Sequence, residues 1–313
     1  MARSYADKSM NSNIRLKTEK TLKTEREDVR DWVLEPFNKN HLFSKPIEKK
    51  IQPFLNDQQT QKKLIPSSFR DISSWYLRLA EDKSLNYTTY PTEELSLSGL
   101  YKFWYYETAH AIMESDDPAG YRFSMRDFTT VSTMLSFGWM NHADRLAETM
   151  LDRWDAQEDG NGSISWESLP QYLPWLSVKL YKAWRGSDEV FDFEPKDEQL
   201  EGFHPLLKAL FDPSASVFGE ALIEAANFHV MGIGTDDYDP VRDEEYWLFP
   251  VEILAACRIR EQRGLDIPYV EHPLFDATPL GRYHHPFPVP RDDILEKVLP
   301  LYAKVTGKLD LKV

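Results

Sequence analysis

Glu107 and His110 are the residues whose type and spacing best suit metal chemistry, because they stand three positions apart in the apolar run 100–115. On a helix this spacing places a carboxylate and an imidazole on one face, where ferritin-like proteins hold metal ions. Such a site needs a second pair of this kind and further glutamates from other helices. We therefore expect this pair to be structural, and we expect neither a metal nor another cofactor.

Glu252 and Cys257 are candidates for chemistry in a second apolar stretch. Glu252 is flanked by Phe249, Val251 and Ile253, and a carboxylate among apolar side chains is normally paired, so we expect a salt bridge to a nearby arginine. Cys257 is the only cysteine of the chain, which excludes an intrachain disulfide. Nothing nearby in the sequence supplies a base, so we expect a core thiol and not a nucleophile.

The run 157–168 imitates a calcium-binding loop. Asp159, Asn161 and Gly162 stand at suitable positions, but Gln157 and Ser168 replace the carboxylates that open and close such a loop. We expect a polar turn between helices.

Two more segments carry ligand-like residues in an unsuitable context. The glycines of 231–237 follow a helix and precede aspartates, whereas a phosphate loop needs a lysine followed by serine or threonine. His284 and His285 are adjacent, and adjacent histidines rarely share one metal centre. The prolines around them indicate an extended segment laid over the surface, so we expect both segments to be structural.

Two acidic runs, at 187–201 and 234–245, combine carboxylates with aromatic rings. Carboxylates steer a basic partner and rings anchor it, so the runs predict protein-binding loops that could emerge on one face of the fold. The alternative is that both are simply solvated connectors. The residues that we expect at the binding surface are Asp188, Glu189, Phe191, Asp192, Asp236, Asp237, Tyr238, Asp239, Asp243 and Glu244.

The charge of the chain is unevenly distributed. The net charge is -14, from 37 basic and 51 acidic residues. Residues 1–70 hold 15 Lys and Arg against 9 Asp and Glu, which leaves 22 against 42, a charge of -20, in the remainder. A body of this charge repels nucleic acid and membranes and attracts basic proteins. The opening residues lack the apolar core of a signal peptide, and no run approaches the roughly 18 apolar residues of a membrane span, so we expect a cytoplasmic protein.

Apolar residues recur at three- and four-residue spacing along most of the chain, and alternating strand patterns are nearly absent. Short loops between such segments predict an all-α fold, an irregular stack of antiparallel helical hairpins. We expect helices near residues 68–82, 93–115, 124–137, 141–155, 169–185, 200–211, 215–231, 243–263 and 291–306. These helices form the expected compact domain, residues 67–313.

Residues 1–66 are expected to form a basic arm and connector. Residues 1–12 look disordered, and 13–34 fit a charged helix or a mobile arm. Four prolines and many polar residues indicate an irregular connector over 35–67.

The segments FGEALIEAANFHV (218–230), YWLFPVEILAACRIREQRGLDIP (246–268) and EHPLF (271–275) give the chain a resemblance to known proteins. Over residues 205–280 it resembles the C-terminal half of bacterial polymorphic-toxin immunity proteins. The likeness is to the immunity protein 49 family and, more loosely, to the immunity partners of PoNe-type DNase toxins.

This resemblance implies a non-catalytic protein that binds a cognate toxin domain in the cytoplasm and covers its basic active-site surface. The toxin would be delivered by a type VI or other secretion system, or by cell contact. Self-association is left open. Two alternatives remain: a helical enzyme with a site around Glu107, His110 and Glu252, and a helical-repeat adaptor unrelated to toxins.

Overall fold

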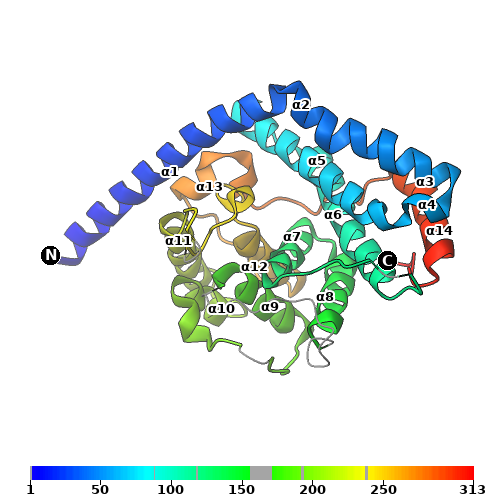
Figure 1. The fold of residues 1–313 in the computed structure, drawn as a ribbon. Helices are drawn as coiled ribbons and strands as arrows, with labels where there is room; N and C mark the ends of the chain where they lie inside the picture. Colours follow the sequence, from blue (N-terminus) through cyan, green and yellow to red (C-terminus); the bar gives the residue numbers. More distant parts are fainter. Residues whose placement is uncertain (1, 88, 118, 156–170, 192–193, 237–238) are drawn as a thin grey trace.

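The structure is a computed structural model, and it describes residues 2–87, 89–117, 119–155, 171–191, 194–236 and 239–313. Throughout these ranges the chain is built from helices and has no β-strand, only an isolated bridge between Ile233 and Val241. The all-α prediction is confirmed (Figure 1). None of the helices in these ranges combines the length and apolar character that crossing a bilayer requires.

Residues 2–64 are helical except at Glu35 and Asp57, so the expected irregular connector is wrong. Helix α1 (Ala2–Leu34) includes residues 2–12, which were expected to be disordered. The helical segments that follow are α2 (Pro36–Lys39), π-helical turns at Asn40–Ser44 and Ile47–Ile51, α3 (Gln52–Asn56), α4 (Gln58–Gln61) and a 3-10 turn at Lys62–Leu64.

The prolines that suggested a connector stand where a helix tolerates them. Pro36 and Pro53 lie in the first turns of α2 and α3, and Pro46 immediately precedes the π-helical turn Ile47–Ile51. A proline lacks the N–H group, but the first-turn N–H groups have no partner within the helix in any case. These prolines therefore mark the joints of a segmented helical region.

The remaining helices follow the predicted positions closely, except for the short helix Pro273–Ala277, which was not predicted. They are α5 (Ile65–Tyr87), α6 (Thr92–Met113), α7 (Thr129–Phe137), α8 (Met140–Asp155), α9 (Tyr172–Arg185), α10 (His204–Ala209), α11 (Ala215–Met231), α12 (Val251–Gln262), α13 (Pro273–Ala277) and α14 (Asp293–Thr306). The largest difference is at α12, which was expected to begin at residue 243. Pro250 caps it instead, and a 3-10 turn, Glu244–Tyr246, precedes it.

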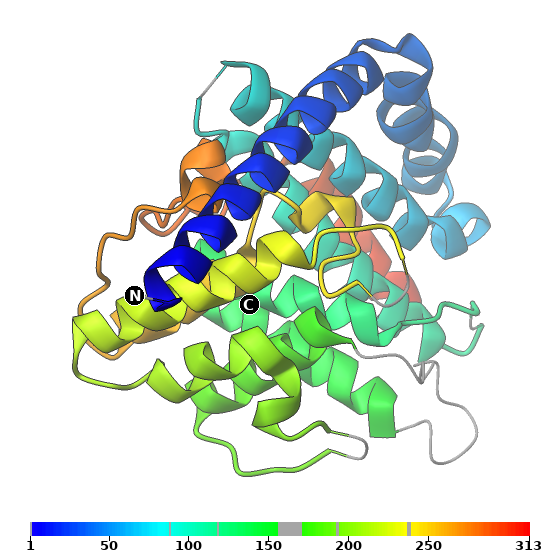
Figure 2. The same ribbon diagram turned by 90° about the vertical axis from the view of Figure 1, so that its left-hand side faces the viewer.

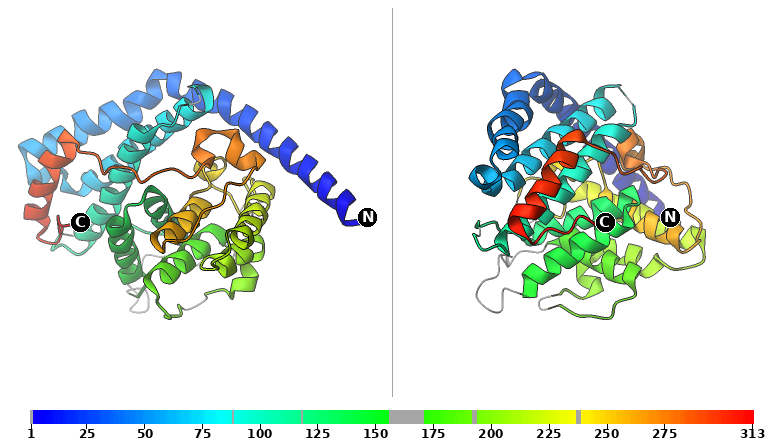
Figure 3. Two further views of the ribbon diagram at one scale, coloured as in Figure 1. Left: turned by 180° about the vertical axis from the view of Figure 1, so that it is seen from behind. Right: turned by 90° about the vertical axis from the view of Figure 1, so that its right-hand side faces the viewer.

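Helix α12 occupies the centre of the molecule. Every residue from Val251 to Arg260 is buried, and the helix packs against α7 and α9. Helices α5 and α6 form a long hairpin beside it, and α1 lies across α5, α11 and α13 (Figures 1 and 2). At the opposite end α14 packs against α3, α4 and α6 (Figure 3).

The N-terminal helices share the core of the body. Ile14, Ile51, Phe54 and Ile65 belong to the main buried cluster. A smaller cluster joins Val29 of α1 to Leu85 and Leu248. These contacts cross residue 66, where the sequence suggested a boundary between arm and domain.

Phe54→Ala tests whether the 35–64 region is part of this core. Phe54 is fully buried and its ring lies 5.9 Å from that of Tyr302. Its truncation should lower the free energy of unfolding by about 3–5 kcal/mol, the range for buried phenylalanines. Urea unfolding measures this. Phe37→Ala is the matched control, because Phe37 is 65% exposed, and equal stabilities for the two variants would contradict the packing.

Candidate functional site

The loop 232–247, between α11 and α12, is tied to itself at both ends. The amide of Val241 donates to the carbonyl of Gly232 at 3.0 Å, and the amide of Gly234 donates to the carbonyl of Val241 at 3.3 Å. The Trp247 indole N–H donates to the same Val241 carbonyl at 3.0 Å. These hydrogen bonds tie the described parts of the loop on both sides of its acidic residues to Val241.

A buried pair beneath the loop connects its two flanking helices. His229 Nδ1 of α11 lies 2.7 Å from Glu252 Oε1 of α12, and both side chains are fully buried. His229 Nε2 lies 3.2 Å from the carbonyl oxygen of Trp247. Since both ring nitrogens face oxygen atoms, each of the two contacts must carry a proton.

The partner expected for Glu252 was an arginine, and this expectation is wrong. The two buried arginines of α12 are engaged elsewhere. Arg258 donates to the His284 carbonyl at 2.6 Å, and Arg260 donates to the Asp212 carbonyl at 2.6 Å. Both guanidinium groups fix loops by capping backbone carbonyls, which leaves His229 as the residue facing Glu252.

Glu252→Ala should destabilise the fold by about 3–5 kcal/mol, because removing one partner strands the other in a buried site. Thermal or urea unfolding measures the loss. Glu224→Ala, at an exposed position of α11, should change stability by less than about 0.5 kcal/mol. If both variants unfold alike, the buried pair does not hold the two helices together.

A cavity of about 610 Å³ opens between this loop, the α5–α6 hairpin and the start of α7. Charged side chains dominate its wall. The cations are Arg78, Lys102, Arg126 and Arg242, and the carboxylates are Asp127, Asp243, Glu244 and Glu245. Such a wall suits a polar or charged group and not an apolar ligand.

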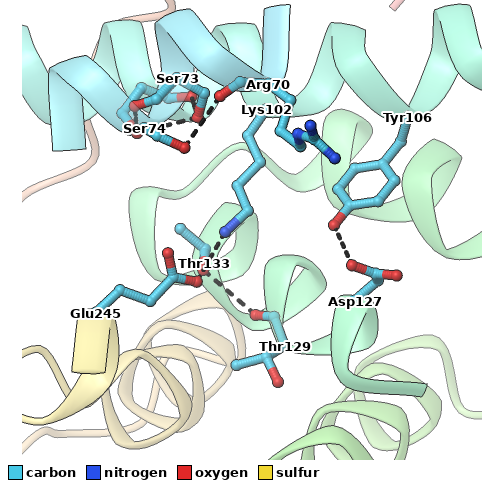
Figure 4. Close-up of polar contacts among 10 residues, drawn as sticks. Arg70, Ser73, Ser74, Lys102, Tyr106, Asp127, Thr129, Thr133 and Glu245 are labelled. Carbon is cyan, nitrogen blue, oxygen red and sulfur yellow. Dashed lines mark hydrogen bonds and ion pairs between the residues drawn. The ribbon is translucent and has the colours of Figure 1, made fainter. Parts of the chain in front are cut away.

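Lys102 of α6 is the central residue of this site (Figure 4). Its ammonium group lies 2.8 Å from Glu245 Oε1 of the loop. Burial on its own lowers the pKa of Lys102, but the adjacent Glu245 carboxylate holds that pKa above its usual value. Burial likewise raises the pKa of Glu245, and the Lys102 ammonium outweighs burial and holds that pKa below its usual value. The pair is therefore ionised and binds the loop to α6.

A second cavity, of about 550 Å³, lies on the other side of Lys102. It shares Lys102, Tyr106, Ser124, Asp127 and Glu245 with the first. The Tyr106 hydroxyl donates to Asp127 Oδ1 at 2.6 Å (Figure 4), and the Ser124 amide donates to Asp127 Oδ2 at 2.5 Å. Ser124 and Asp127 thus cap the 3-10 turn Met125–Phe128 that precedes α7, which holds Asp127 at the junction of the two cavities.

The structure brings part of the predicted binding surface to the first cavity. Asp243 and Glu244 line its wall. Asp236, which precedes them in the loop, is exposed, and its amide donates to Asp239 Oδ2 at 2.8 Å. The predicted residues Asp237 and Tyr238 lie outside the described residues.

The other acidic run lies elsewhere, so the two runs do not share one face. Figures 1 and 2 place the chain after α9 at the lower end of the molecule, away from the loop 232–247. Asp188 and Glu189 are exposed there. Phe191 is half-buried, with the Lys182 ammonium 5.4 Å from its ring centre. Asp192 lies outside the described residues.

Glu107 and His110 serve separate structural contacts. Arg145 Nε donates to Glu107 Oε2 at 2.5 Å, and the Thr149 hydroxyl donates to Oε1 at 2.7 Å. Arg145 also donates to the Asp310 carbonyl at 2.6 Å, so the glutamate orients an arginine that fixes the C-terminal segment. His110 instead lies 2.9 Å from Asp152.

The chain contains a second Glu-x-x-His pair, Glu201 and His204, which does not complete a metal site. Glu201 has a φ of 49° at a kink, and its carboxylate accepts a hydrogen bond from the Tyr172 hydroxyl at 2.8 Å. Within the described ranges no three His, Cys, Asp and Glu side chains gather as a metal ion would require. The calcium-like run 157–168 lies outside these ranges.

Cys257 and His284 are packing residues. Burial raises the pKa of the Cys257 thiol to about 12, so it stays protonated. His284 stacks on Phe287 with 4.2 Å between ring centres, and burial lowers its pKa to about 4. The segment that carries it is extended, as predicted. It is not only a surface segment, because Phe287 is buried and its amide donates to the Phe137 carbonyl at 2.9 Å.

Three of the site residues were missed by the sequence analysis: Arg78, Lys102 and Glu245. A signal for Lys102 was present, because it is the only basic residue in the otherwise apolar and aromatic run 100–106. A charge at such a position is rarely buried without a partner. The partner, Glu245, is 143 residues away, and its identity required the fold.

Comparisons with protein-family models, with curated proteins and with solved structures gave no match to this chain.

Proposed function

We propose that this protein is an immunity protein that binds and neutralises a cognate bacterial toxin domain, and that the loop 232–247 is the centre of its binding surface. One observation carries the proposal. Asp243 and Glu244, predicted from the sequence as partner-binding residues, line an open charged cavity. They follow Val241, whose backbone is hydrogen-bonded to Gly232 and Gly234 at the start of the loop. The resemblance over residues 205–280 includes this loop and both helices that flank it.

The charge of the protein supports a basic partner. Residues 71–313 carry 22 basic and 42 acidic residues, so the body attracts cationic surfaces and repels phosphates. Surfaces that bind nucleic acids or nucleotides are commonly basic. A toxin with such a surface would meet a complementary potential here and would lose access to its substrate when covered.

The fixed loop favours tight association. A loop already held in its bound conformation loses little conformational freedom on binding, so more of the contact energy remains as affinity. The exposed carboxylates would accelerate encounter, and groups that enter the cavity would slow dissociation. Occlusion of this kind requires no catalytic group on the immunity protein.

The two alternative functions have less support. The enzyme alternative needs Glu107, His110 and Glu252 to converge, yet they contact Arg145, Asp152 and His229 respectively. A helical adaptor could use the same loop. A small toxic domain encoded by the neighbouring reading frame would distinguish an immunity protein from an adaptor, and co-expression should then rescue growth.

Charge reversal tests the proposed surface. Asp236→Lys combined with Glu244→Lys should slow association with that toxin domain roughly tenfold or more, because exposed charges steer encounter. Surface plasmon resonance at low and high salt measures the rates. Asp188→Lys with Glu189→Lys makes the same change in net charge at the other acidic run and should have a much smaller effect. Equal slowing by both would show that only the overall charge matters.

A further inference from the structure

Arg78 of α5 is surrounded by glutamates from three parts of the chain, a group that we name the Arg78 cluster. It consists of Glu25 of α1, Arg78 and Glu81 of α5, and Glu244 of the loop. Arg78 donates to Glu81 at 2.9 Å and to Glu244 at 3.3 Å. Glu25 is only 7% exposed. No residue in the described part of the chain donates a hydrogen bond to its carboxylate, whose electrostatic neighbours are Arg78, Glu244 and Asp28.

The cluster has more carboxylates than cations. With the adjoining pair of Lys102 and Glu245 it holds four glutamates, Glu25, Glu81, Glu244 and Glu245, against two cations. Two negative charges therefore lack a partner. A carboxylate withdrawn from water without a partner is costly, so such a group either takes up a proton or recruits a cation.

In the free protein, protons take the place of the missing cation. Burial raises the pKa of Glu25 to about 7, helped by Glu244 and Asp28 and opposed by Arg78. Burial raises the pKa of Glu81 to about 8, helped by Glu245 and Glu25 and opposed by Arg78. The charged groups that face these carboxylates come from α1, α5 and the loop.

The cluster can be reached from solvent through the first cavity. Arg78 and Glu244 both line that cavity. The Glu244 side chain is 50% exposed and that of Arg78 is 25% exposed. A side chain that enters the cavity would thus meet Glu244 and Arg78. Glu81 and Glu25 do not line the cavity, but both interact with Arg78.

We propose that the Arg78 cluster is a receptor for a basic side chain of the partner protein, and that this cation displaces protons from Glu25 and Glu81 when it binds. The partner itself rests on the proposed function. We infer that the ligand is positively charged from the charges of the cavity wall and the cluster. Together the cavity wall and the cluster hold Arg78, Lys102, Arg126 and Arg242 against Glu25, Glu81, Asp127, Asp243, Glu244 and Glu245, an excess of two negative charges.

Binding should therefore tighten as the pH rises. Below pH 7 Glu25 is protonated and must lose its proton before it can pair with the incoming cation. For one carboxylate with a pKa of about 7, affinity should increase about tenfold between pH 6 and pH 8. Participation of Glu81 would increase this ratio further.

The test uses the full-length protein and a blocked tri-arginine peptide as the probe. Isothermal titration calorimetry at pH 7 in two buffers of different ionisation enthalpy counts the protons released. At pH 7 we expect release of about half a proton per peptide from Glu25 and more if Glu81 takes part, with binding at pH 8 at least about tenfold tighter than at pH 6. Binding without proton release, no binding at either pH, or preference for a tri-glutamate peptide, inorganic phosphate or calcium would overturn the proposal.

Glu25→Gln provides the matched variant, because it removes the titrating group and keeps the shape of the side chain. It should remove the share of the pH dependence and of the proton release that Glu25 contributes, and leave the share of Glu81. Glu27→Gln, at an exposed position of the same helix, should leave both unchanged. If Glu25→Gln does not fold, the proton count on the unmodified protein still decides the matter.

The experiment separates this proposal from the proposed function. A toxin domain that binds equally at pH 6 and pH 8, and binds equally to Glu25→Gln, would disprove the receptor site and leave the immunity function intact. If the peptide binds with proton release but no toxin domain from a neighbouring reading frame binds, the receptor site is supported and the immunity function is disproved.

Discussion

The buried contact between His229 and Glu252 is the constraint on which the arrangement of the site depends. It joins α11 to α12, the helices on either side of the loop 232–247, and the second ring nitrogen of His229 contacts the backbone of Trp247. The Trp247 indole in turn holds Val241. This series of contacts holds Val241 and Trp247 of the loop to α11 and α12. In a buried environment such contacts are strong only while every member is paired, so the loop depends on the whole set.

Ion pairs hold the loop to α5 and α6. Glu245 pairs with Lys102 of α6, and Glu244 pairs with Arg78 of α5. The same arrangement concentrates more carboxylates than the two cations can neutralise, so burial and the neighbouring carboxylates raise the pKa values of Glu25 and Glu81, and their ionisation opposes folding. Features that reduce stability in this way concentrate at functional sites, where a ligand supplies the missing interaction. The ion pairs to α5 and α6 keep these carboxylates close together. The proposed partner cation would supply the positive charge that they lack.

The sequence was a good guide to the helices and a weaker one to the site. Regular apolar spacing located α5 to α12 and α14, because burial of one face determines a helix, but it missed the short helix α13. A charged helix was one of two alternatives for residues 13–34 of α1. The helical segments between α1 and α5 were missed because their prolines were taken as breakers, although a first turn tolerates a proline. The loop 232–247 was proposed as a binding loop from its own carboxylates. Its cationic neighbours, Arg78 and Lys102, were not found, because sequence spacing carries no information on contacts between residues more than a hundred positions apart.

Hydrogen–deuterium exchange of the protein, free and bound to the toxin domain of its neighbouring reading frame, tests the central claim most directly. If the loop 232–247 is the centre of the binding surface, its amides and those of α5 around Arg78 should exchange more slowly in the complex. The chain around Asp188 and Glu189 should exchange as in the free protein. Protection confined to other surfaces, with the loop exchanging equally in both states, would contradict the account.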